Sequence, residues 1–395
     1  MHLQNISLIN FKNYSQVELE FSARINCFVG NNGVGKTNIM DAIHYLSLTK
    51  SFFNSIDSQN IKYDEDFFVI QGSFLRGDTQ ENIYCSSKRN KKKQFKRNKK
   101  EYQRLADHIG LLPVVMISPA DSNLITGGSD ERRKFINAVI SQFDRNYLND
   151  LIQYNKALAQ RNKLLKDFAR SGRFDKESLE LWDEQLIPLS QKIYSKRVDF
   201  IDKLVPVFQK YYDSIAMGKE SVGLVYQSHH HDANFRDVFK DAVDKDRILQ
   251  YTTRGVHKDD LVLELNGYQI KRVGSQGQQK TYLVALKLAK YEFIKEVSSS
   301  NPILLLDDVF DKFDASRVTQ IIQLVSENQF GQIFITDTHQ SRLEKILSGL
   351  SADFRLFRIN KEIEEIKGLE GLEGVEGERK RKRKKRRKND RTIER

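Results

Sequence analysis

The chain has 395 residues, of which 39% are hydrophobic and 30% charged, and this balance predicts a large buried core divided between two domains. Its formal net charge of +12 favours an anionic partner. The two cysteines, Cys27 and Cys85, are too few for a disulfide framework. A signal-peptide pattern and a membrane-spanning apolar stretch are both missing. We therefore expect a soluble, cytoplasmic protein with no membrane partner.

The first predicted strands lead into a phosphate-binding loop. Alternating apolar runs predict strands at 2–10, 17–21 and 24–29, and helical spacing of apolar residues follows from Ile39. Between them lies the pattern G-x-x-x-x-G-K-[ST], formed by Gly30, Asn31, Asn32, Gly33, Val34, Gly35, Lys36 and Thr37. We expect backbone N–H groups to surround the phosphates, Lys36 to reach the β- and γ-phosphates, and Thr37 to hold Mg²⁺. The loop alone does not separate kinases, GTPases and ATPases.

A very basic segment follows two further strands, predicted at 67–74 and 82–87. Residues 91–95 and 101–104 are expected to form a hairpin around Asn98. Two interpretations stay open: contact with a DNA backbone, or a solvated edge hairpin protected by lysines. The density of charge favours DNA contact slightly, and the candidate residues are Lys91, Lys92, Lys93, Lys96, Arg97, Lys99 and Lys100.

The middle of the chain is predicted to be mainly helical. A short strand at 112–117 is followed by Ser129, which is expected to cap a helix with acidic residues in its first turn. Heptad-like apolar stripes at 147–168 and 182–204 then predict packed helices. Pro188 and Pro206 are expected to kink or break the helix that carries the second stripe. A small antiparallel bundle of two or three helices fits this pattern better than a long coiled coil.

Two buried parallel strands are predicted near the C-terminal end. A hairpin with Asn266-Gly267 at its turn, whose second strand covers 268–273, precedes a helix. The strand at 303–306 ends in Asp307 and Asp308, and the strand at 332–336 precedes His339. Asp307 is expected to hold Mg²⁺ through water, and Asp308 to orient or deprotonate the attacking water.

Several of these segments resemble ABC-type ATPases. The stretch with Ser275, Gln276 and Gly277 is similar to the signature motif, and Asp311 stands in a segment similar to the loop used across the dimer seam. His339 occupies the place of the γ-phosphate-sensing histidine. Asp308 stands where most ABC ATPases have Glu, which suits slow hydrolysis. An equivalent of the Mg²⁺-sensing glutamine is not evident near Ser118.

Taken together, the motifs resemble the RecF family of bacterial repair ATPases, related to the Rad50 and SMC heads. The similar segments are Asn10–Tyr14, Ser118–Asp121 with Gly127–Phe135, and Arg254–Leu261, in which Val256 and Lys258 depart from the family pattern. The resemblance covers about residues 1–360. It implies action at single-strand gaps and single-strand/double-strand junctions, support for RecA loading with RecO and RecR, and a role in the SOS response.

The expected fold is α/β: an ABC-type ATPase head, with a mixed-sheet phosphate-loop lobe and an inserted α-helical lobe. The predicted parts are an N-terminal part of lobe I at 1–120, helical lobe II at 121–250, the rest of lobe I with the signature motif at 251–360, and a disordered basic tail at 361–395. The tail either adds salt-sensitive nucleic-acid affinity or is dispensable.

The resulting hypothesis is a DNA-binding, ATP- and Mg²⁺-dependent homodimer. One chain would supply Lys36, Thr37, Asp307 and Asp308, and the partner would close the site with its Ser275 and Gly277. The alternatives are an SMC- or Rad50-like structural ATPase, or an ABC-type ATPase of another process. Only a short helical insert separates the motifs, which disfavours long coiled-coil arms. The sequence does not give the preferred DNA structure, the hydrolysis rate or the DNA contacts.

Overall fold

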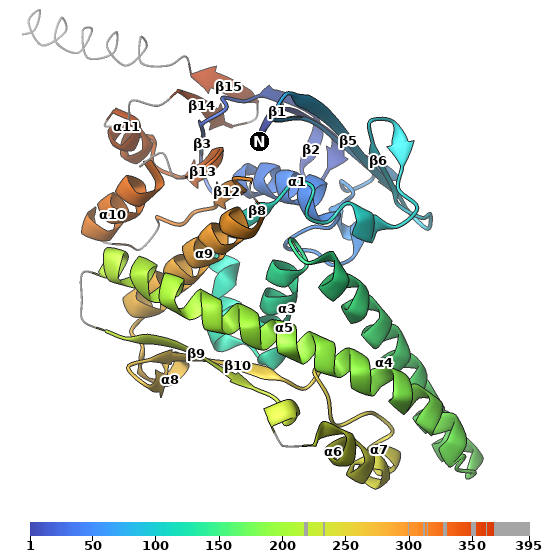
Figure 1. The fold of residues 1–395 in the computed structure, drawn as a ribbon. Coiled ribbons are helices and arrows are strands. Elements are labelled where there is room, and N and C mark those ends of the chain that lie inside the picture. Colours follow the sequence, from blue (N-terminus) through green and yellow to red (C-terminus); the bar gives the residue numbers. More distant parts are fainter. Residues whose placement is uncertain are drawn as a thin grey trace, which may run out of the picture. The chain divides into compact units, whose positions relative to one another are not determined.

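The structure is a computed structural model that describes residues 1–216, 220–231, 234–298, 300–310, 313, 315–326, 330–348, 353–360 and 362–366. The chain forms two compact units. Unit 1 consists of Met1–Tyr102, Ile303–Asp311 and Ile321–Arg395, and unit 2 consists of Gln103–Pro302 and Lys312–Gln320. The ribbon is shown in Figure 1.

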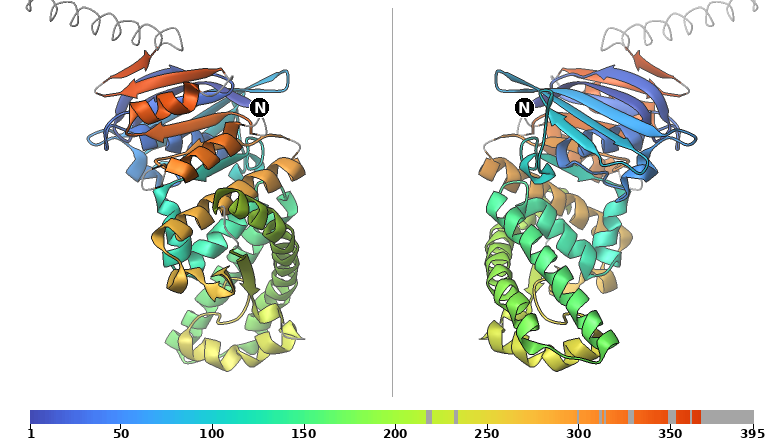
Figure 2. Two further views of the ribbon diagram at one scale, coloured as in Figure 1. Left: turned by 90° about the vertical axis from the view of Figure 1, so that its left-hand side faces the viewer. Right: turned by 90° about the vertical axis from the view of Figure 1, so that its right-hand side faces the viewer.

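Unit 1 contains an antiparallel sheet with the strand order β2-β1-β4-β5-β6-β7, drawn in blue and cyan in Figure 2. Its strands are β1 (His2–Phe11), β2 (Tyr14–Glu20), β4 (Phe67–Arg76), β5 (Thr79–Lys88), β6 (Gln94–Arg97) and β7 (Lys100–Glu101). The predicted hairpin is shorter than expected. Asn98 and Lys99 both have positive φ, of 49° and 70°, so the chain turns within two residues and β7 has only two.

A second sheet of unit 1 carries the phosphate-binding loop. Its strands there run in the order β15-β14-β3-β13-β12, with ranges β3 (Ile25–Val29), β12 (Ile303–Leu306), β13 (Ile333–Asp337), β14 (Phe354–Ile359) and β15 (Ile363–Ile366). β3 pairs in parallel with β13 and β14, and β12 pairs in parallel with β13. Every residue of β3, β12 and β13 is buried, as expected of parallel strands that are covered on both faces.

Helix α1 (Lys36–Leu48) begins directly after the loop. It contacts β1, β4 and β5 of the antiparallel sheet and β13 of the second sheet, and Ile39, Met40 and Ile43 are fully buried. Because both sheets pack on one helix, the start of α1 is held in a fixed position next to the loop. Helix α11 (Gln340–Ser348) follows β13.

Unit 2 is built around the helical hairpin of α4 (Arg145–Ser171) and α5 (Lys176–Ala216), with α9 (Gln276–Ser298) packed on α5 (Figure 1). A three-stranded sheet, ordered β11-β10-β9, also packs on α5 through β9. The other strands and α-helices described in unit 2 are β8 (Val114–Ile117), β9 (Val222–Gln227), β10 (Asp260–Leu265), β11 (Tyr268–Gln269), α2 (Asn123–Thr126), α3 (Ser129–Ile140), α6 (Phe235–Asp241), α7 (Val243–Leu249) and α8 (Ile270–Val273). Helix α10 (Ala315–Ser326) contains the boundary between the units.

Three local predictions for unit 2 are wrong. Of the predicted kink or break at Pro188 and Pro206, the break is wrong: α5 continues through both prolines, because both flanks of each proline bury apolar side chains such as Leu186, Ile193 and Leu204. Ser129 is the first residue of α3, and the cap position belongs to Gly128. The second strand of the late hairpin ends at Gln269, where burial of Ile270 accompanies the short helix α8.

The domain limits also differ from those predicted. Unit 2 begins at Gln103 and continues to Pro302, so the stretch around Ser275 belongs with the helices, since α9 packs on α5. Within the expected disordered tail at 361–395, Ile363–Ile366 form β15, which pairs antiparallel with β14. The basic run at 379–388 lies outside the described residues.

Candidate nucleotide site and nucleic-acid surface

Two glycines of the phosphate-binding loop, Gly30 and Gly35, are packed so closely that no other residue could replace them without a shift. A Cβ on Gly30 would lie 2.3 Å from the carbonyl oxygen of Ile359. Gly35 has φ of 114°, and a Cβ there would lie 2.6 Å from both the Asn13 Nδ2 atom and the Tyr14 hydroxyl oxygen. The loop backbone is therefore packed against the neighbouring segments of unit 1.

Lys36, the first residue of α1, folds back over this loop. Its Nζ donates hydrogen bonds to the carbonyl oxygens of Gly30 at 2.8 Å and Asn31 at 3.0 Å. The residue is only 4% exposed. The ammonium group is thus held inside the loop, at the position where the loop pattern places the β- and γ-phosphates of a nucleotide.

The structure brings Thr37 and Asp307 into direct contact. The Thr37 hydroxyl donates to Asp307 Oδ1 at 3.0 Å, and the Thr336 hydroxyl donates to the same oxygen at 2.8 Å. Burial raises the pKa of Asp307 to about 6, against the opposing effect of these two hydrogen bonds. The carboxylate is therefore anchored at the start of the loop helix.

The donor set at this point fits Mg²⁺ bound together with a nucleotide. Mg²⁺ prefers one or two carboxylates with phosphate oxygens and waters, rather than a cage made by protein alone. Thr37 and Asp307 supply one hydroxyl and one carboxylate. Among the described residues there is no group of three His, Cys, Asp or Glu side chains placed to hold a metal ion.

Asp308 has an unusual backbone conformation for a residue other than glycine. Its φ is 47°, in the left-handed region, and its N–H donates to the Thr336 hydroxyl at 2.8 Å. The residue is half-buried. It follows directly after Asp307 at the end of β12, next to the loop helix.

His339 lies just beyond the end of β13. In the parallel pairing of β13 with β3, Asp337 is opposite Val29, the last residue before the loop. The His339 N–H donates to Asp337 Oδ1 at 2.8 Å, and Arg342 pairs with the other oxygen of that carboxylate at 3.2 Å. His339 is exposed. Asp311 lies outside the described residues.

Four residues beside the loop were not assigned a role from the sequence. The Asn13 Nδ2 atom donates to the Val34 carbonyl at 3.0 Å, and Asn38 donates to the Asn13 Oδ1 atom at 2.7 Å. The Tyr14 hydroxyl is buried and has no hydrogen-bond partner within the described part of the chain. Thr336 is the fourth. The Asn10–Tyr14 motif was the only signal for Asn13 and Tyr14, because their contacts with the loop are long-range.

The Ser275 segment of unit 2 forms the start of α9. The Ser275 hydroxyl accepts the N–H of Gln278 at 3.2 Å, and the Ser275 N–H donates to Gln278 Oε1 at 2.8 Å. This is a capping box. Gln278 also donates to Glu220, which accepts a 2.6 Å hydrogen bond from Tyr212 of α5. A Cβ on Gly277 would lie 2.7 Å from a guanidinium nitrogen of Arg317.

The basic hairpin divides into inward and outward cations. Lys93 points inward: its Nζ contacts the Tyr45 hydroxyl at 3.0 Å, the Thr49 carbonyl at 2.6 Å and the Asp57 carboxylate at 2.9 Å. Arg97 pairs with the buried Glu81 and lowers the pKa of that carboxyl. Lys96 lies over the Tyr84 ring. The outward cations, which are exposed, are Lys91, Lys92, Lys99 and Lys100.

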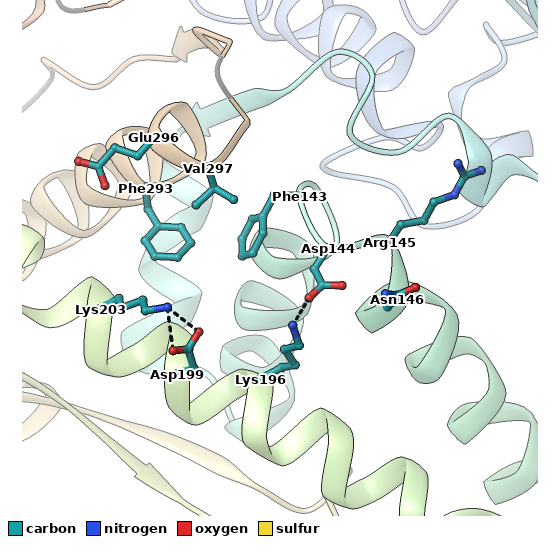
Figure 3. A pocket seen from close by; sticks show the side chains of 10 residues that line it. All are labelled: Phe143, Asp144, Arg145, Asn146, Lys196, Asp199, Lys203, Phe293, Glu296 and Val297. Atoms are coloured by element: carbon teal, nitrogen blue, oxygen red, sulfur yellow. Dashed lines mark hydrogen bonds and ion pairs between the residues drawn. The ribbon is translucent and has the colours of Figure 1, made fainter.

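Unit 2 also has an open cleft that contains none of the predicted site residues (Figure 3). Its volume is about 690 Å³, and Phe143 and Phe293 contribute aromatic rings to its lining. Lys196 pairs with Asp144 at 2.7 Å and Lys203 pairs with Asp199 at 2.8 Å (Figure 3). Because these charges neutralise one another, the cleft has no clear preference for an anion or a cation.

In the part of the chain that the structure describes, none of the helices is long and apolar enough to cross a bilayer.

Several known proteins are similar to this chain in sequence and in fold. The family model described as the RecF/RecN/SMC N terminal domain matches residues 2–358. The DNA replication and repair protein RecF of Bacteroides fragilis strain YCH46 is 54% identical over 360 residues, which are 91% of this chain and 96% of that protein. A solved structure of the recombination mediator protein RecF with ATP, in the RecFOR pathway, is 30% identical with a TM-score of 0.83, covering 93% of this chain and 98% of the other.

A Smc head domain from Pyrococcus furiosus shares the fold alone, with a TM-score of 0.56, 17% identity, and coverage of 96% of this chain and 99% of that chain. The mixed sheets, the phosphate loop and the helical insert define an ABC-type ATPase head. The family model and the closely similar relatives narrow this class further: the chain belongs to the RecF family.

Proposed function

We propose that this chain is an ATP-dependent DNA-binding protein of recombinational repair and replication, acting in the cytoplasm as an ATP-induced homodimer. The proposal that the chain binds a nucleotide is supported mainly by the contact between Thr37 and Asp307, which joins the phosphate loop to the carboxylate at the end of β12. A RecF structure that is 30% identical contains ATP, which supports the same ligand here.

In the proposed site, the loop N–H groups and Lys36 bind the triphosphate, and Thr37 and Asp307 hold Mg²⁺. The metal would neutralise charge on the β- and γ-phosphates. Asp308 accepts a proton from the attacking water, and His339 contacts the γ-phosphate. Hydrolysis is slow and resets the protein, since the short Asp308 side chain reaches less far than a glutamate.

Dimerisation follows if the partner copy closes the site. Ser275 and Gly277 lie at the beginning of α9, a helix of 23 residues, whose N-terminal N–H groups favour a phosphate. In the proposed dimer this end of one copy binds the γ-phosphate held by the other, together with Gln276 and the Asp311 segment. ATP then stabilises the dimer because it contacts both copies only in that state.

DNA is the proposed anionic partner, and its contacts are the outward lysines of the hairpin, Lys91, Lys92, Lys99 and Lys100. Lys93 is excluded because its ammonium group is engaged inside unit 1. The family implies gaps and single-strand/double-strand junctions as DNA targets, RecO and RecR as partners, and support for RecA loading and the SOS response. These finer roles are part of the proposal.

Footprinting on a gapped duplex tests this function. The expected result is protection at the junction that requires ATP and weakens between low and high salt, because phosphate contacts release counterions. A matched nick-free duplex is the control. Equal protection of both duplexes, with and without ATP, would contradict the proposed ATP-dependent action at gaps.

A further inference from the structure

Thr336, in the buried strand β13, joins the two acidic residues at the end of β12. Its hydroxyl oxygen accepts the Asp308 N–H at 2.8 Å, and its proton is donated to Asp307 Oδ1 at 2.8 Å. A hydroxyl has one proton and two lone pairs, so it can make both bonds at once. The residue is fully buried, at 0% exposure.

The position of this hydroxyl is fixed by the sheet. Ile335, the residue before Thr336, pairs with Leu306 of β12, and Thr336 itself pairs with Phe28 of β3. Two parallel neighbours therefore hold the Thr336 backbone. A threonine side chain also has few rotamers, so the hydroxyl oxygen has little freedom to move.

The bond to Asp308 matters because Asp308 is held in a strained conformation. Its φ of 47° costs about 1–2 kcal/mol in a residue with a Cβ. Such a conformation persists only where the surroundings impose it. The hydrogen bond holds the peptide plane between Asp307 and Asp308, from which the Asp308 Cα–Cβ bond extends, and so restricts where the carboxylate can be placed.

We propose that Thr336 is a positioning residue for ATP hydrolysis, which holds Asp308 in the conformation that aims its carboxylate at the attacking water. The inference rests on the proposed function. In the step concerned, the water oxygen forms a bond to the γ-phosphorus, and the bond from that phosphorus to the β–γ bridging oxygen breaks. Asp308 accepts one water proton and later releases it to solvent, so ADP, phosphate and one proton result.

The same hydroxyl orients the Asp307 carboxylate. Because Thr336 and Thr37 both donate to Oδ1, the other oxygen, Oδ2, would be the one available to the proposed Mg²⁺. Groups that orient metal ligands in this way typically change affinity or activity by about 10- to 100-fold when removed. Thr336 does not itself need to touch the nucleotide.

The test compares Thr336→Val, which removes the hydroxyl at constant shape, with Thr336→Ser, which keeps it. Thr281→Val is the matched control, since Thr281 is equally buried and its hydroxyl has no hydrogen-bond partner among the described residues. Three quantities are measured: the Kd for a fluorescent ATP analogue without metal, the single-turnover hydrolysis rate with Mg²⁺, and amide hydrogen exchange of the peptide covering Asp308.

Thr336→Val is expected to keep the metal-free Kd within about 3-fold, to lose about 10- to 100-fold in rate and to exchange faster at Asp308. Thr336→Ser and Thr281→Val are expected to stay near the wild-type rate. If Thr336→Val does not fold, Thr336→Cys replaces it, because a thiol is a weak hydrogen-bond group of similar size, and the same rate loss is expected.

A wild-type hydrolysis rate in Thr336→Val would overturn the inference, and the same holds for Thr336→Cys where it replaces the valine variant. A Thr336→Ser variant that is as slow as the valine variant would also overturn it. These outcomes differ from a failure of the proposed function. A wild-type chain that binds ATP and never hydrolyses it would remove the hydrolysis step, and this inference with it.

Discussion

The hydroxyl of Thr37 and the carboxylate of Asp307 are joined by a 3.0 Å hydrogen bond although 270 residues separate them in the chain. The contact arises because β3 and β12 are both parallel neighbours of β13, so their carboxyl ends meet at the same edge of the sheet. Nucleotide sites in open α/β sheets form at such an edge.

Gly35→Ala is expected to abolish ATP binding. The new Cβ would lie 2.6 Å from two polar side-chain atoms, at a φ of 114° that L-residues rarely adopt. Gly33→Ala is the matched control: its φ of 83° is also strained, but nothing lies within 4 Å of the added atom. Titration with a fluorescent ATP analogue should show a much larger loss for Gly35→Ala. Equal losses would show that backbone strain, rather than contact with Asn13 and Tyr14, decides the effect.

Lys91→Ala is expected to change DNA binding, whereas Lys93→Ala is expected to change the stability of the fold. Lys91 is exposed, so its loss should weaken DNA binding and reduce the salt dependence by about one phosphate contact. Lys93 is paired with Asp57 inside unit 1, so its loss should lower the free energy of unfolding by about 1–3 kcal/mol and leave the salt slope unchanged. Salt-dependent DNA titrations and urea unfolding separate the two effects. A changed salt slope in Lys93→Ala would be inconsistent with the observed hairpin.

Lys290→Met is expected to stabilise the protein near pH 7. Burial, together with the charge of Lys287, lowers the pKa of Lys290 from 10.5 to about 7. The unfolded chain therefore binds more protons between pH 7 and 10.5, and wild-type stability gains about 3 kcal/mol from this group between pH 7 and 9.5. The methionine variant lacks that gain because it has no group to titrate.

Urea unfolding of wild type and Lys290→Met at pH 7 and 9.5 measures this difference. Lys287→Met is the contrasting variant: Lys287 pairs with the buried Asp121 at 2.5 Å, so its removal leaves a carboxylate unpaired and should destabilise the protein. If the stability difference between wild type and Lys290→Met does not change with pH, Lys290 is not held in the unfavourable environment described.

Much of unit 1 could be predicted from the sequence because its signals are local. The G-x-x-x-x-G-K-[ST] loop lies between a strand and a helix as expected, and the apolar run ending at Asp307 forms β12. Long-range contacts could not be predicted in the same way. Thr336 bridges Asp307 and Asp308 only because β13 lies beside β12, and neighbouring strands are not evident from spacing.

The errors have physical causes as well. The intrinsic effect of proline on a helix was overridden by tertiary packing along α5, which remains continuous over 41 residues. Lys93 belongs to a basic run that looks uniform, yet its side chain turns inward to Asp57. Charge density therefore predicted a basic surface, and only the structure separates its outward cations from its inward ones.

The most direct test of the account is sedimentation with saturating ATP, Mg²⁺ and gapped DNA, applied to wild type, Lys36→Ala and Ser275→Ala. The wild type should sediment as a dimer. Lys36→Ala should lose nucleotide binding by on the order of 100-fold and remain a monomer, since its ammonium group makes charge-assisted bonds to the phosphates. Ser275→Ala should bind ATP normally and also remain a monomer. A wild type that stays monomeric, or a Ser275→Ala variant that dimerises as the wild type does, would contradict the shared nucleotide site.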